Sequence, residues 1–241
     1  MVSSWESTKV DGSDMRLYMS VPDGRGPVPA VVVIQHQWGV DEFIEEMTER
    51  IASAGYIGIA PDLYHRDGPD CQDDGPTRRA RLRDVNIIND VNATVDFLKG
   101  LSQINSNRLG IVGFCLGGRV AYLMAAANPS FKAAASYYGG SIMVPWGEGP
   151  SPFERTSEIH CPLIGLFGEI DPNPTPEDMR KLDAELTRYG KVHEFYSYAG
   201  ANHAFMNRRG DRYHAHADQD SWPKTLAFFA KYLGRVTARS R

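Results

Sequence analysis

Residues 111–119 read IVGFCLGGR, and the part that decides the fold is Gly113-Phe114-Cys115-Leu116-Gly117. The apolar run RLGIVGF at 108–114 precedes the turn, and the alanine-rich run VAYLMAAA at 120–127 follows it. This order is typical of a sharp strand-to-helix turn in which glycines lift a central nucleophile above a sheet. The helix that follows offers free N–H groups and the positive end of its dipole, which favour an anion such as a thiolate. The pattern therefore indicates a nucleophilic cysteine at position 115.

A second interpretation of Cys115 stays open at this point. A free cysteine often behaves as a small buried hydrophobe, and glycines also permit close packing of a strand against a helix. The five-residue pattern alone does not decide between the two interpretations. A nucleophile needs partner residues elsewhere in the chain.

Apolar runs that alternate with helical segments indicate the architecture. Several runs are apolar almost throughout, as strands buried on both faces are. The segments 41–54 and 221–233 carry apolar residues along one helical stripe. Alternation of this kind predicts an α/β fold with a mostly parallel central sheet of about seven to eight strands and helices on both faces. We expect strands at 16–21, 30–35, 56–64, 108–114, 132–138, 162–168 and 192–198.

Length and composition predict one domain over residues 1–241. The chain is 42% hydrophobic and 23% charged, which is sufficient for a sizeable core, and it contains no internal repeat or linker that would divide it. The Pro- and Gly-rich stretches 67–76 and 144–152 are expected to be surface loops, which often line a site. A formal net charge of −4 gives no electrostatic footprint for nucleic acid or a membrane surface. We expect a small-molecule substrate, and a monomer or weak homodimer.

The N-terminal residues lack the basic head and continuous apolar stretch of a signal peptide, and the apolar run at 30–34 is too short to span a bilayer. A cytoplasmic protein is the simplest interpretation. Cys71, Cys115 and Cys161 are an odd number at wide spacing, which fits neither a disulfide framework nor a zinc cluster. His214 and His216 have no third ligand in the sequence pattern, so we expect no metal and no cofactor.

Two polar residues follow predicted strands at the places where partners of Cys115 belong. Asp171 follows the strand at 162–168, and His203 follows the strand at 192–198. Taken singly, an Asp in a loop is usually a cap or turn residue and a His in a loop is usually solvated. Their order in the chain after Cys115 is the nucleophile, acid, base order of the α/β-hydrolase fold. The coincidence of order, strand position and turn favours a triad.

The sequence resembles the dienelactone hydrolase family of α/β-hydrolases from about residue 15 to about residue 234. The resemblance is carried by GFCLGGR at 113–119, the W-G-V-D turn at 38–41, AGYIGIAPDLY at 54–64, GEIDPNP at 168–174 and NHAF at 202–205. It implies a triad of Cys115, Asp171 and His203 that hydrolyses an ester or lactone.

The chemistry of these residue types agrees with that implication. A Cys115 thiolate attacks an acyl carbon, His203 is oriented by Asp171, and water resolves the resulting thioester. The backbone N–H groups of Leu116 and Gln37 are expected to stabilise the oxyanion. A thiolate is a good leaving group, so activated esters and lactones suit it better than amides do.

The sequence departs from the best-known family members directly before Gln37, one of the two residues expected to stabilise the oxyanion. Those members carry a glutamate that helps control the proton of the nucleophile, whereas this chain has His36 there, between Gln35 and Gln37. Two interpretations stay open: His36 handles a proton in place of the carboxylate, or it only hydrogen-bonds a loop.

Substrate-binding residues are less clear from the sequence. The family's typical substrate is an anion held by arginines, one of them four residues past the histidine, where this chain has Asn207. Arg208 follows it, and a basic run at 78–83 includes Arg81; such a run is usually a solvated helix face. Both arginines are candidates for substrate binding. The aromatic residues Trp38, Tyr137, Tyr138 and Trp146 are candidates for a pocket wall or for the core, and of these Trp38 and Tyr138 are the candidate substrate-binding residues.

Two other classes of function share these features. One is a non-catalytic α/β-hydrolase scaffold that binds a ligand, and fast alkylation of the triad thiol distinguishes an enzyme from it. The other is a promiscuous cysteine hydrolase of phosphotriesters or neutral aryl esters. A comparison of anionic lactones with neutral aryl esters distinguishes this second class.

Overall fold

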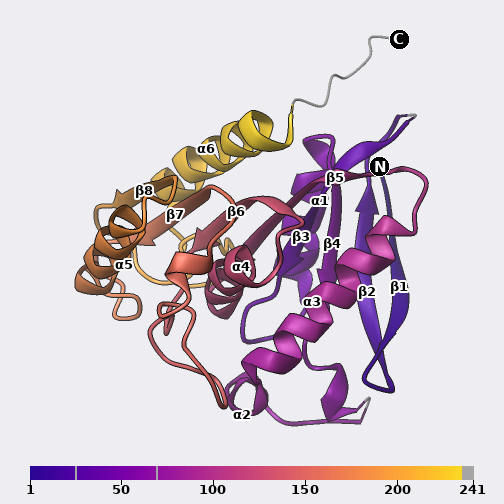
Figure 1. The fold of residues 1–241 in the computed structure, drawn as a ribbon, viewed down its shortest axis with the longest axis horizontal. Coiled ribbons are helices and arrows are strands. Elements are labelled where there is room, and N and C mark those ends of the chain that lie inside the picture. The colour runs from indigo at the N-terminus through magenta and orange to yellow at the C-terminus, as the bar shows by residue number, and fades with distance from the viewer. Residues whose placement is uncertain (25, 69, 235–241) are drawn as a thin grey trace.

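A computed structural model describes residues 1–24, 26–68 and 70–234 and shows one eight-stranded sheet in the order β1-β2-β4-β3-β5-β6-β7-β8 (Figure 1). The two pairings of β2 are antiparallel and the pairings from β4 to β8 are parallel, which confirms the predicted mostly parallel sheet. The strands are β1 (Val2–Val10), β2 (Ser13–Val21), β3 (Val28–Ile34), β4 (Ile57–Pro61), β5 (Ile104–Phe114), β6 (Phe131–Tyr137), β7 (Leu163–Gly168) and β8 (His193–Tyr198).

Helices cover both faces of the sheet, as predicted. Side chains of α3, α4 and α5 pack in one buried cluster, and side chains of α1 and α6 pack in the other. Strand β3 serves both clusters, because Val32 faces the first and Val33 the second, as alternation along a strand requires. The helices are α1 (Glu42–Ser53), α2 (Gly75–Arg81), α3 (Asp84–Lys99), α4 (Leu116–Ala127), α5 (Pro176–Arg188) and α6 (Ala215–Leu233), with 3₁₀ turns at His65–Asp67 and Thr156–Glu158.

Several elements of the fold differ from those expected from the sequence. Strand β1 lies at the sheet edge, and its residues are exposed or half-buried apart from Val10, so it lacks the apolar run of a central strand. Helices α3 and α5 were also not anticipated. The stretch 67–76 expected as loop holds the end of a 3₁₀ turn and the start of α2, which continues into the basic run interpreted as a helix face. The stretch 144–152 does contain no helix or strand.

The parallel strands bring the candidate residues to one edge of the sheet. Strand β5 ends at Phe114 beside Tyr137 of β6, and Gly168 of β7 pairs with Tyr198 of β8. The loops that follow these strands carry the elbow, the acid and the histidine. No helix within the described residues is both long and apolar enough to cross a membrane.

Candidate active site

Cys115 occupies a strained turn between β5 and α4. Its backbone has φ 61° and ψ −119°, a region that costs a residue with a Cβ about 1–3 kcal/mol. A Cβ on Gly113 would lie 1.9 Å from the carbonyl oxygen of Gly117, and one on Gly117 would lie 2.4 Å from that of Ile34. Both glycines are therefore required by close backbone approach. The turn leaves the Cys115 side chain half-exposed at the start of α4.

Asp171 and His203 form a hydrogen-bonded pair at the same edge of the sheet. His203 Nδ1 lies 2.8 Å from Asp171 Oδ2, and the other carboxylate oxygen accepts a hydrogen bond from the Asn173 N–H at 2.8 Å. Asp171 is only 2% exposed. Burial lowers the pKa of His203, but its hydrogen bonds to Asp171 and Cys115 and the negative charge of both partners outweigh burial and raise that pKa to about 9. The site therefore favours a protonated His203 imidazole at neutral pH.

Two cavities open on these residues. The first, of about 310 Å³, is lined by Cys115 and His203 together with His36, Trp38 and Tyr138. The second, of about 240 Å³, is lined by Cys115, His203 and Asp171 together with Leu116. Gln37 lines both. The structure thus brings together the predicted triad residues, both predicted oxyanion residues and His36.

The turn that carries Gln37 is braced from two sides. The Tyr64 hydroxyl donates to the Gln37 carbonyl oxygen at 2.9 Å. A Cβ on Gly75, in the first turn of α2, would lie 2.4 Å from the same oxygen, so the helix packs directly on the turn. Leu116 is the first residue of α4, and its N–H has no acceptor within the helix. Leu116 and the braced Gln37 thus both line the second cavity.

His36 is buried between the cavity and the start of α1. Its Nε2 lies 2.8 Å from Asp41 Oδ2, at ion-pair distance but outside good hydrogen-bond alignment. The other oxygen of Asp41 accepts from the N–H groups of Phe43 and Ile44 at 3.1 and 3.2 Å and so caps α1. Burial raises the pKa of Asp41, but the close contact and charge of His36 and the two backbone N–H groups hold that pKa below its ordinary value. His36 thus contacts a loop carboxylate and also faces the cavity of Cys115.

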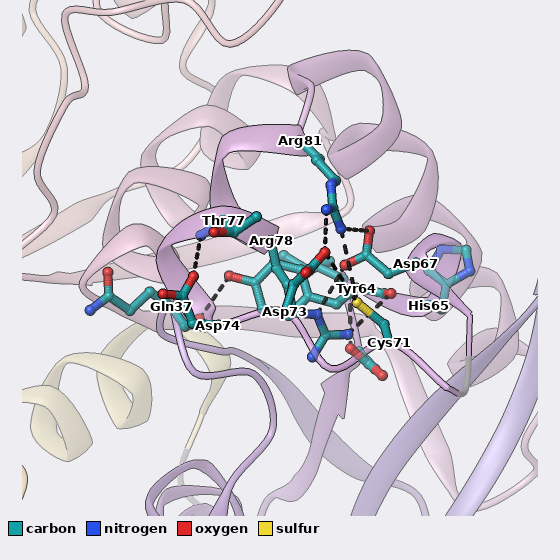
Figure 2. A network of polar contacts seen from close by, with 12 residues as sticks. Gln37, Tyr64, His65, Asp67, Cys71, Asp73, Asp74, Thr77, Arg78 and Arg81 are labelled. Carbon is teal, nitrogen blue, oxygen red and sulfur yellow. Dashed lines mark hydrogen bonds and ion pairs between the residues drawn. The ribbon is translucent and has the colours of Figure 1, made fainter.

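Arg81 and Arg208, both predicted as substrate-binding candidates, lie outside the two cavities. Figure 2 shows Arg81 turned toward Asp67 and Asp73, with which it forms ion pairs. Arg208 binds the buried Asp218 at 2.8 Å. Each arginine therefore has a carboxylate partner that holds it away from Cys115.

Arg79 and Arg212 are found in the cavities instead. Arg79 lines the second cavity and Arg212 lines both, and neither has a carboxylate partner within the described residues. Arg79 belongs to the basic run noted in the sequence, but Arg212 was missed. Successive helical residues point about 100° apart, so Arg79 and Arg81 face opposite sides of α2. Helical periodicity could have indicated that Arg79 faces another side than Arg81. The sequence offers no comparable signal for Arg212, which lies in a loop.

The aromatic candidates divide between the cavity and the core. Trp38 is 55% exposed and lines the first cavity. Tyr138 lines it too, although the residue is buried and its hydroxyl has no hydrogen-bond partner. Tyr137 is a core residue whose hydroxyl shares a hydrogen bond of 2.7 Å with Thr225. Trp146 packs on the guanidinium of Arg119 and lines a separate hollow.

The other cysteines are not part of the site. Cys71 and Cys161 are free thiols, and burial raises the pKa of Cys161 to about 12. Within the described part of the chain, no group of three or more His, Cys, Asp or Glu side chains is placed to hold a metal ion. His214 instead caps α6 by accepting a hydrogen bond from the Ala217 N–H.

Known proteins resemble this chain in sequence and in fold. The chain matches the Dienelactone hydrolase family over residues 15–233. A Synechocystis protein described as "Putative carboxymethylenebutenolidase" is 33% identical over 226 residues, which cover 90% of this chain and 91% of that protein. A crystal structure described as "Putative Dienelactone Hydrolase" from Klebsiella pneumoniae is 32% identical, with a TM-score of 0.87 and coverage of 96% of this chain and 99% of that one.

A dienelactone hydrolase-like promiscuous phosphotriesterase from metagenomic libraries has a TM-score of 0.83 over 96% of this chain and 98% of its own, but at 18% identity it shows only the shared fold. The first two matches extend over almost the whole chain, and the resemblance inferred from the sequence motifs is confirmed. The chain belongs to the dienelactone hydrolase family, and it is a hydrolase of the kind that cleaves lactones and esters.

Proposed function

We propose that this hydrolase cleaves small activated carboxylic esters and lactones through a triad of Cys115, Asp171 and His203 and a thioester acyl-enzyme. The observation that carries the proposal is the hydrogen bond of 2.8 Å between Asp171 and His203, which faces the same cavity as a cysteine held on a strained elbow. A nucleophile, a base and a group that orients the base are the parts that acyl transfer requires.

In the acylation step, the Cys115 thiolate adds to the carbonyl carbon and the carbonyl oxygen becomes an oxyanion. The N–H groups of Leu116 and Gln37 donate to that oxyanion. When the adduct collapses, the bond to the leaving oxygen breaks and protonated His203 supplies its proton. The products of this half-reaction are a thioester on Cys115 and the free alcohol or enol.

In the deacylation step, neutral His203 accepts a proton from water as the water oxygen adds to the thioester carbonyl. The second adduct expels the Cys115 thiolate and releases the carboxylic acid. His203 is left protonated beside the thiolate, which restores the starting state. The raised pKa of about 9 supports a protonated His203 in that starting state.

We assign recognition of a substrate carboxylate to Arg79 and Arg212. Both guanidinium groups line the second cavity and lack a carboxylate partner within the described residues, so an incoming carboxylate does not compete with an existing ion pair. Arginine suits this task because its planar group binds carboxylate with two parallel hydrogen bonds. This charge favours an anionic ester or lactone over a neutral phosphotriester.

Replacement of the nucleophile tests the triad. Cys115→Ala is expected to lower the turnover of p-nitrophenyl acetate by on the order of a thousandfold or more, because triad members act as a unit on one intermediate. Cys71→Ser is the matched control, since that thiol lies outside both cavities. Most of the activity surviving in Cys115→Ala, or being lost in Cys71→Ser, would mean that another residue carries the reaction.

A further inference from the structure

Tyr64 is a buried residue in the loop after β4 that contacts the turn of residues 36–39, which we call the oxyanion turn. Its hydroxyl donates a hydrogen bond of 2.9 Å to the carbonyl oxygen of Gln37. The residue is only 2% exposed, so water competes little for this bond. Burial raises the pKa of Tyr64, so the hydroxyl keeps its proton and remains a donor at neutral pH.

Two hydrogen bonds tie the loop after β4 to the chain that leaves β3. The side-chain oxygen of Gln35 accepts from the Leu63 N–H at 3.0 Å, and the next residue along, Tyr64, binds the Gln37 carbonyl oxygen. Gln35 and Leu63 are both buried, so the first bond is shielded from water. The pair of bonds therefore sets where the Tyr64 side chain lies relative to the oxyanion turn.

Arg78 of α2 holds Tyr64 from the opposite side. Its guanidinium carbon lies 4.4 Å from the centroid of the Tyr64 ring, and Figure 2 shows the same side chain bound to Asp67, where the Nε atom donates at 2.9 Å. A second nitrogen of Arg78 donates to the Tyr64 carbonyl oxygen at 3.4 Å. The ring and the backbone of Tyr64 are thus both held, and the hydroxyl acts on Gln37 from a fixed position.

The direction of the Gln37 N–H depends on the two peptide units that flank this residue. The Gly39 N–H donates to the His36 carbonyl oxygen at 3.1 Å, which closes a β-turn with Gln37 in its second position. Because the peptide unit is planar and trans, fixing the His36 carbonyl also fixes the Gln37 N–H in the opposite direction. The Tyr64 hydroxyl fixes the next peptide unit through the Gln37 carbonyl. Rotation of the Gln37 backbone would therefore break one of these two bonds.

We propose that Tyr64 is a positioning residue for acyl transfer, whose hydroxyl holds the Gln37 carbonyl and thereby aims the Gln37 N–H at the oxyanion of both tetrahedral adducts. The inference rests on the proposed function, in which that N–H stabilises the oxyanion. A donor stabilises developing charge best when its direction is fixed before the reaction begins. Tyr64 is not among the residues that line the two cavities, so it affects the rate of the chemical steps and not the binding of substrate.

Tyr64→Phe removes the hydroxyl and keeps the ring. With p-nitrophenyl acetate, the burst and the steady-state release of p-nitrophenol report acylation and deacylation separately. We expect both rates to fall about tenfold, because both adducts carry an oxyanion, which is less than outright removal of such a donor costs. Alkylation of Cys115 by iodoacetamide is expected to keep its wild-type rate, because displacement of iodide by the thiolate forms no oxyanion.

Tyr122→Phe is the matched control, because Tyr122 is also buried and its hydroxyl shares a hydrogen bond of 2.6 Å with Thr156, away from both cavities. Each variant loses one buried hydroxyl bond, so both are expected to lower the melting temperature, but only Tyr64→Phe is expected to slow acyl transfer. Gly75→Ala is a second test variant. The added Cβ would lie 2.4 Å from the Gln37 carbonyl oxygen and so displaces that oxygen from the side of α2, which predicts the same kinetic changes.

Slower acylation and deacylation with unchanged alkylation, in Tyr64→Phe but not in Tyr122→Phe, supports the inference. Wild-type rates in Tyr64→Phe, equal losses in Tyr122→Phe, or a parallel loss of Cys115 alkylation would overturn it and leave the triad in place. If Tyr64→Phe does not fold, the rates of Gly75→Ala decide in the same way. Activity retained by Cys115→Ala would instead overturn the proposed function on which the inference rests.

Discussion

At the scale of single side chains, the protonation of His203 governs the chemistry of the site. The hydrogen bond and charge of Asp171 contribute to a pKa of about 9, compared with an ordinary value of 6.5. Because the folded-state pKa is raised, the charged pair contributes stability that is fully present below the ordinary value and is lost as the pH rises through about 9. Acylation by esters with poor leaving groups needs this same proton.

We therefore expect kcat/KM for a trifluoroethyl ester to fall as the pH rises through about 9. Asp171→Asn removes the carboxylate charge, so the fall is expected at lower pH, and NMR titration of the His203 ring is expected to shift in the same direction. Asp183→Asn is the control, because Asp183 forms a comparable contact of 3.0 Å with His193, which is the first residue of β8 and lies outside both cavities. Identical His203 titrations in wild type and Asp171→Asn would contradict the assigned role of Asp171.

The turn from β3 to α1 acts as one element, since His36, Gln37 and the helix cap Asp41 lie within six residues. His36 contacts the capping carboxylate and faces the cavity of Cys115, so the same imidazole connects helix α1 to the nucleophile. A histidine in this position is able to exchange a proton near neutral pH. We interpret it as a residue that assists His203 in accepting the proton of Cys115 when the thiolate forms.

On that interpretation, His36→Ala lowers the acylation rate and changes the pH dependence of Cys115 alkylation by iodoacetamide, and His36→Glu recovers part of the rate. The measurement is the inactivation rate against pH for the three proteins, followed at the peptide that carries Cys115. Superimposable profiles would show that His36 only supports the turn and that activation depends on His203.

Helix α6 anchors the loop that carries His203 and Arg212. Buried Asp218 in α6 accepts from Arg208 at 2.8 and 2.9 Å and from the Tyr213 hydroxyl at 3.0 Å, and it also binds Arg50 of α1. Arg208, a substrate-binding candidate in the sequence, thus has a structural role. It ties the histidine loop to two helices that cover one face of the sheet.

At the scale of the whole molecule, the features that local sequence patterns predicted are those that backbone sterics and burial determine. The elbow was predictable because Gly113 and Gly117 are forced by backbone contacts, and the central strands were predictable because they are buried on both faces. Strand β1 was not, because a strand at the sheet edge with one solvated face carries a mixed sequence.

The substrate side of the site was not predictable for a different reason. Which arginine faces the cavity depends on the orientation of α2 and on carboxylates distant in the sequence, such as the pairing of Arg81 with Asp67. The shape of the two cavities depends on loops after five different strands, β3, β5, β6, β7 and β8, and has no local signature in the sequence.

The thioester acyl-enzyme tests the central claim most directly. The enzyme is mixed with excess phenyl hemisuccinate, quenched in acid within the first turnovers, and digested for peptide mass analysis. We predict one hemisuccinyl group on the peptide that carries Cys115, lost on treatment with hydroxylamine and absent in Cys115→Ala. Release of phenol in a burst while the acyl group is found on another residue, or on none, would contradict a Cys115 thioester.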